Sequence, residues 1–105
     1  MTNLTEIKNF AFQIAAQFKP ERIILFGSYA SGKATADSDV DLLVVMPFKG
    51  RSVKQAVKIR LAVDSPFPLD ILVRTPRQLT ERLKLGDSFM REVVHEGKVL
   101  YERAS

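Results

Sequence analysis

Two aspartates at the start of an apolar segment, Asp39 and Asp41, are spaced for metal-dependent chemistry. If the segment is a strand, residues two apart point to the same face of the sheet, so both carboxylates share one face while Val40 and Leu42 enter the core on the other. Neighbouring carboxylates repel, and burying both in ionised form is costly without a cation. The pair therefore predicts a divalent cation, and all-oxygen ligation favours magnesium or manganese over zinc.

A third aspartate, Asp70, stands in the apolar run 69–73, where strand propensity and burial both disfavour an acid. If this run lies beside the Asp39/Asp41 strand, the three carboxylates can hold two metal ions about 3.5–4 Å apart. Two such ions stabilise an in-line displacement at phosphorus and the departing pyrophosphate. We therefore predict Asp39, Asp41 and Asp70 as catalytic residues and as the ligands of two Mg²⁺ ions.

The pair Gly27-Ser28 follows the apolar run 23–26 and precedes a short helical pattern over 28–31. Without a Cβ, Gly27 lets the backbone pass close to a ligand, and amides at a helix start favour an anion. The Ser28 hydroxyl adds a further polar group. The two residues are predicted to bind the phosphates of a nucleoside triphosphate.

Other interpretations of these motifs remain open. The segment 27–34 nearly matches a Walker A loop but ends in Ala34, which lacks the hydroxyl that would bind magnesium. The acids at 37–41 could be solvated turn residues, which accounts well for Asp37. A basic run between Lys49 and Arg60 is either a solvated helix face or a contact to triphosphate, RNA or an acidic partner.

Hydrophobic periodicity and capping residues predict the elements that must position these side chains. The fold class is α/β (α+β), a small mixed sheet with helices packed on it. Capping boxes are expected at Ser52/Gln55 and Thr75/Gln78, and Asp87 is expected to cap the last helix. Phe89 in that helix is either a core residue or part of a partner surface, and the core interpretation is favoured. Helices are predicted at 4–18, 28–31, from 52 (with an apolar stripe at 53, 56, 57 and 61), from 76 and from 88, and strands at 23–26, 39–46, 69–73 and 99–101.

Composition limits the classes of protein that the chain can represent. Its 105 residues, 46% hydrophobic and 27% charged, fit one globular domain, and the absence of cysteine excludes disulfides and thiolate metal sites. A net charge of +4 suits phosphate-bearing ligands or an acidic partner but is mild for a nucleic-acid binder. No targeting or membrane segment is recognised, so a cytoplasmic location and no membrane contact are expected.

The motif from Gly27 to Leu42, in which Gly-Ser is followed after ten residues by Asp-x-Asp, together with Asp70, resembles the signature of the DNA polymerase β superfamily. In length and element order the chain is similar to minimal nucleotidyltransferases. The resemblance implies a single nucleotidyltransferase domain over residues 1–105, with metal ligands and phosphate contacts at the five positions identified above.

Such proteins are often encoded with a HEPN-type toxin, and the resemblance implies a hetero-oligomer in which the chain is the antitoxin. It also implies transfer of AMP from ATP to a hydroxyl of that partner. Where relatives commonly have Gly-Ser-x-Ala-Arg-Gly, this chain has Ser31 in place of the arginine. An antitoxin that acts by binding alone is therefore the alternative, and a small-molecule transferase is a third hypothesis.

Overall fold

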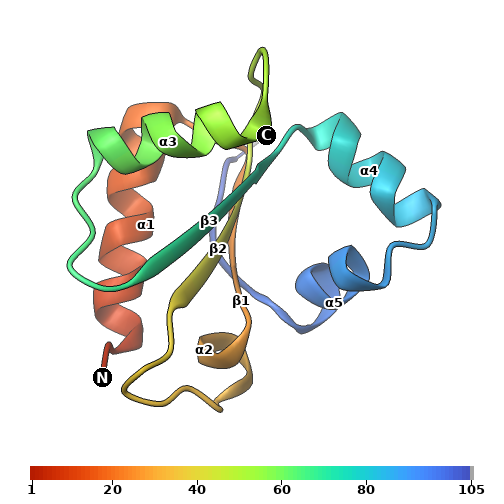
Figure 1. The fold of residues 1–105 in the computed structure, drawn as a ribbon. Helices are drawn as coiled ribbons and strands as arrows, with labels where there is room; N and C mark the ends of the chain where they lie inside the picture. Colours follow the sequence, from red (N-terminus) through yellow and green to blue (C-terminus); the bar gives the residue numbers. More distant parts are fainter. Residues whose placement is uncertain (105) are drawn as a thin grey trace.

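A computed structural model describes residues 1–104 as a four-stranded sheet with helices on both faces (Figure 1). The strand order is β3-β2-β1-β4. β1 runs antiparallel to both β2 and β4, whereas β2 and β3 are parallel, so the predicted mixed sheet is confirmed. The strands are β1 (Arg22–Phe26), β2 (Val40–Val45), β3 (Leu69–Arg74) and β4 (Lys98–Glu102).

One face of the sheet is covered by α1 (Leu4–Phe18) and α3 (Ser52–Ala62). α1 begins at the side-chain cap of Asn3 and ends at Lys19, whose backbone is left-handed, just before Pro20. Its apolar stripe buries Phe10 and Ile14 against strand residues such as Leu42, which is fully buried. This face holds the larger core cluster and supplies most of the apolar burial that stabilises the fold.

The other face carries α4 (Pro76–Lys84) and α5 (Ser88–Glu96), which pack on a smaller core cluster (Figure 1). The even-odd alternation of the strands produces this division, because Leu43 faces α4 and α5 while Leu42 faces α1. The short helix α2 (Ser28–Ser31) closes the end of β1. Asp41 shares the parity of Leu43, so it lies on the α4/α5 side of the sheet.

The capping box predicted at the start of α3 is wrong. The N-cap residue is Arg51, which makes no side-chain cap, and the helix already includes Ser52. Gln55 is turned inward and buried, where its amide nitrogen lies 3.6 Å from Sδ of Met46. The apolar stripe that indicated this helix is not its buried face, because Val53 is 66% exposed and the buried positions are Gln55 and Ile59.

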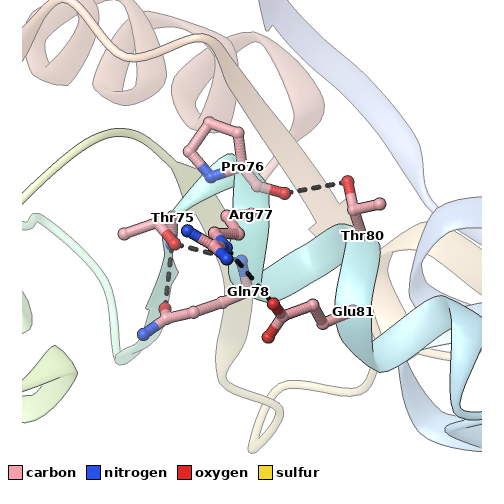
Figure 2. Close-up of polar contacts among 6 residues, drawn as sticks. All are labelled: Thr75, Pro76, Arg77, Gln78, Thr80 and Glu81. Atoms are coloured by element: carbon pink, nitrogen blue, oxygen red, sulfur yellow. Dashed lines mark hydrogen bonds and ion pairs between the residues drawn. The ribbon is translucent and has the colours of Figure 1, made fainter.

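The caps predicted for the last two helices are confirmed. At α4 the Thr75 hydroxyl accepts from the amide of Gln78, and the Gln78 side chain accepts from the amide of Thr75, which completes a capping box (Figure 2). At α5 the Asp87 carboxylate accepts from the amide of Met90. These bonds satisfy backbone donors that a helix start leaves without partners.

None of the helices within residues 1–104 is both long enough and apolar enough to span a membrane.

Candidate active site

Gly27 follows β1 and has a backbone conformation that residues with a side chain rarely adopt, with φ 74° and ψ −152°. A Cβ at this position would overlap Oδ2 of Asp41, so the carboxylate of Asp41 lies directly against the glycine backbone. The β1–β2 register, in which Phe26 pairs with Asp41, produces this approach. The structure therefore brings together Gly27 and Asp41, two of the residues predicted from the sequence.

Ser28 begins α2 and is half-buried. Its carbonyl accepts a bond from the amide of Lys33 and another from the hydroxyl of Ser31, at 3.0 and 3.2 Å. The position where relatives have an arginine is thus occupied by a hydroxyl that bonds within its own turn. The first amides of any helix lack intrahelical partners, so the amide of Ser28 is suited to a phosphate oxygen.

Asp41 and Asp70 are direct partners in the parallel ladder of β2 and β3. Neighbouring strands lie about 4.8 Å apart, and paired residues share a face of the sheet. Asp39 stands two residues before Asp41, just ahead of β2, and is exposed. The strand pairing expected for Asp70 is confirmed, and the exposed fraction of its side chain is 64%.

Burial raises the pKa of Asp41, and the negative charges of Asp70 and then of Asp39 raise it further. The charges of Asp70 and Asp39 thus act on Asp41 at this end of the sheet. The effect is the like-charge repulsion that disfavours ionisation of neighbouring carboxylates.

The three carboxylates do not close around a common point. Oδ1 of Asp70 lies 3.8 Å from Nη2 of Arg60, an α3 residue that also donates to the Leu69 carbonyl. Across residues 1–104 no three aspartate, glutamate, histidine or cysteine side chains are grouped closely enough to hold a metal ion. The joint metal-binding role of Asp39, Asp41 and Asp70 therefore stays a prediction.

The donor set nevertheless fits a divalent cation. The three candidate ligands offer only carboxylate oxygens, which suit magnesium or manganese. Their mutual repulsion, expressed in the raised pKa of Asp41, is the interaction that a bound cation would reverse. Asp41 and Asp70 would be the central ligands because their strands are paired, and Asp39 would reach the ion from the chain just before β2.

A cleft of about 400 Å³ lies beside Gly27 and Asp41. Its opposite wall is the face of α5 that carries Phe89, Glu92 and Glu96. The Phe89 ring meets Phe26 edge to face at 5.7 Å and is 45% exposed, so its interpretation as a core residue is wrong.

Sequence reasoning also missed the two glutamates. The three- and four-residue spacing of 89, 92 and 96 places all three side chains on one helix face, which is the signal that could have found them. Lys33 supplies a positive charge to the cleft.

The fold is that of a nucleotidyltransferase. Residues 7–101 match the family described as "Nucleotidyltransferase domain", and the chain belongs to this family. The family implied by the Gly-Ser and Asp-x-Asp motif is thereby confirmed.

Three individual proteins resemble the chain over most of its length. MJ0604 of Methanocaldococcus jannaschii, provisionally named a protein adenylyltransferase, is 32% identical over 97 residues, which cover 90% of this chain and 94% of that protein. The crystal structure of a provisionally named nucleotidyltransferase from Sulfolobus solfataricus superposes with a TM-score of 0.65 at 19% identity, covering 95% and 80% of the two chains. A toxin–antitoxin structure with AMP-PNP superposes with a TM-score of 0.60 at 25% identity, covering 91% and 73%.

Proposed function

We propose that this chain transfers AMP from ATP to a hydroxyl of a partner protein, with Mg²⁺, and serves as the antitoxin of a HEPN-type toxin. The observation that carries the proposal is the contact of Asp41 with Gly27 at a cleft, with Asp70 on the adjoining strand. Acceptor and role are inferred from relatives, since one is named for protein adenylylation and another is a toxin–antitoxin structure with a nucleotide analogue.

In the proposed reaction the hydroxyl oxygen of the partner bonds to the α-phosphorus of ATP. The bond from that phosphorus to the bridging oxygen breaks, pyrophosphate leaves, and the hydroxyl proton passes to solvent. Bound magnesium would supply Lewis-acid stabilisation of the phosphate charge. Gly27 lets the Asp41 carboxylate lie against the backbone beside the cleft, and Lys33 adds a positive charge to the cleft.

Arg60 is assigned a positioning role toward Asp70. Its guanidinium balances the charge of Asp70 from outside the cleft, at the outer edge of β3. Both side chains are about half exposed, so the pair is weak and Asp70 can exchange it for a stronger ligand.

A second candidate function is inhibition of the toxin by binding alone. Ser31 favours it, because the serine hydroxyl bonds to the Ser28 carbonyl and leaves this turn without the guanidinium that relatives have there. A lysine two residues later presents a point charge and does not reproduce the two parallel bonds of an arginine.

The test is incubation of the chain with labelled ATP, Mg²⁺ and the purified protein encoded beside it, the candidate toxin. Wild type should label the partner. Asp39→Asn with Asp41→Asn should reduce labelling by about a hundredfold or more, because loss of groups that merely support metal ligands already costs about 10- to 100-fold. Asp37→Asn is the matched control, since it removes an exposed acid of the preceding loop and should leave labelling unchanged.

Two results separate the candidate functions. Labelling that survives the double substitution would contradict the catalytic role of the aspartates. A toxin that receives no label from wild type, yet is inhibited equally by wild type and the double variant, would support inhibition by binding alone.

A further inference from the structure

A second concave surface lies between α3 and the outer edge of β3, two elements that adjoin in Figure 1. This surface, called here the α3 groove, has a volume of about 610 Å³. Val53, Ala56 and Val57 line it from the helix, and Ile71, Leu72 and Val73 line it from the strand. It is separate from the cleft beside Gly27, although Arg60 contacts both the groove and Asp70.

An exposed apolar ridge begins at Val53 and Val57, which line the α3 groove, and continues along the helix to Leu61, beyond the lining residues. Val53, Val57 and Leu61 follow one another at four-residue spacing and are 66%, 47% and 80% exposed. Rows of side chains four residues apart are the ridges by which one helix packs into another. Aliphatic side chains aligned in this way mark an interaction site more often than isolated exposed residues do.

The charged residues that line the groove are all arginines. Arg51, Arg60 and Arg74 line it, and no acidic residue does so within residues 1–104. Lys54 and Lys58 stand on the exposed side of the same helix. A partner that covers the ridge therefore has to bring carboxylates to its border.

This charge distribution discriminates between possible occupants. A second copy of the chain packed groove against groove would place like charges opposite each other, which is unfavourable. A nucleic acid would satisfy the arginines through its phosphates but would leave the aliphatic ridge without apolar contacts. A protein segment with both apolar and acidic side chains satisfies both features.

Backbone contacts indicate how such a segment docks. Alternate residues of β3 point their carbonyls to its outer edge, and two of these, Leu69 and Val73, accept bonds from Arg60 and Arg74. Arginines placed on an edge in this way oppose the addition of another strand. The groove is therefore suited to side-chain packing by a helix.

We propose that the α3 groove docks an amphipathic helix of a partner protein, with its apolar face on Val53, Val57 and Leu61 and its acidic border on the surrounding arginines and lysines. This inference rests on the proposed function, because it locates the partner that receives the AMP. Arg60 links the groove to Asp70, so a helix bound there lies next to the candidate site.

The test measures the dissociation constant between this chain and the purified candidate toxin encoded beside it. Leu61→Glu is compared with Leu85→Glu, because the two leucines are equally exposed, at 80% and 78%, and lie on different surfaces. Leu61→Glu should weaken binding by about tenfold or more, because it places a charge in the apolar ridge that the partner helix covers, and Leu85→Glu should not. Lys58→Glu is compared with Lys84→Glu in the same way, and hydrogen exchange should show protection of α3 and of one partner helix.

Each alternative has its own result. If wild type binds and labels the toxin but Leu61→Glu and Leu85→Glu behave alike, the groove assignment is overturned and the proposed function stands. If Leu61→Glu instead dissociates a homodimer in sedimentation, or abolishes binding of a single-stranded RNA oligonucleotide while toxin binding is unchanged, the occupant is not a partner helix. If wild type does not bind the toxin at all, both the proposed function and the inference are refuted.

Discussion

At the scale of single residues, Gly27 connects the backbone of the fold to the candidate chemistry. Its φ and ψ lie in a region that costs other residues about 1–3 kcal/mol, and the space of a Cβ is already filled by the Asp41 carboxylate. The glycine is therefore required twice, once for conformation and once for contact with a predicted ligand.

The change Gly27→Ala should lower both the stability of the fold and the transfer of AMP to the partner, because the added methyl group displaces the Asp41 side chain. Gly32→Ala is the matched control. Gly32 also has positive φ, at 77°, but no heavy atom lies within 4 Å of a Cβ built there, so only the backbone cost of about 1–2 kcal/mol applies. Thermal unfolding and the labelling assay measure the two effects. Equal losses in both variants would contradict the contact with Asp41.

At the scale of elements, the chain relies on side-chain caps to start α4 and α5. Asp87 caps α5 and also pairs with Arg82, whose Nη2 lies 2.8 Å from its carboxylate. The bond from the Met90 amide, followed by the bond from Arg82, lowers the pKa of Asp87 below the ordinary 3.8. The ionised carboxylate therefore stabilises the folded state above pH 3.8, and this contribution is lost as the pH falls through the lowered pKa.

The change Asp87→Asn keeps a capping side chain but removes the charge. It should lower the melting temperature at neutral pH, and the difference from wild type should shrink as the pH falls below 3.8. Thr75→Ala removes the uncharged cap of Figure 2 and should cost about 1 kcal/mol with little dependence on pH. A difference between wild type and Asp87→Asn that does not change with pH would show that charge has no part in this cap.

The sequence predicted those elements whose signals are local. Proline, glycine and capping residues placed the boundaries of α1, α4 and α5, and the alternation around Asp41 assigned it to the correct face. The predicted buried face of α3 was wrong because this short helix has two possible apolar stripes. The space left beside β3 decides which of them faces the sheet. That space accepts Gln55 and Ile59 and leaves Val57 outside.

Parts of the candidate site were beyond prediction for a related reason. The ion pair of Arg60 with Asp70 joins a helix on one face to a strand residue on the other, and only the edge position of β3 allows it. The cleft likewise depends on α5 lying across from Gly27. The two are about sixty residues apart in the sequence, and no motif links them.

At the scale of the whole molecule, one face of the sheet holds most of the core and the other holds the cleft. The face under α1 and α3 holds the larger core, which includes Phe10, Ile14 and Leu42. The face under α4 and α5 has the smaller core and leaves a cleft at one end, which Asp41 of β2 lines, and Asp70 of β3 is paired with Asp41. Like-charge repulsion is thus concentrated at the end of the sheet where a bound cation would relieve it, while the opposite face provides most of the apolar burial.

The central claim is that Asp41 and Asp70 bind a divalent cation beside Gly27. Paramagnetic broadening of backbone amide signals by Mn²⁺ measures this directly, because Mn²⁺ replaces Mg²⁺ at oxygen ligands. With an ATP analogue present, the broadening should be centred on Gly27, Asp41 and Asp70 and should be lost in Asp41→Asn. Broadening centred elsewhere, or unchanged in Asp41→Asn, would contradict the claim.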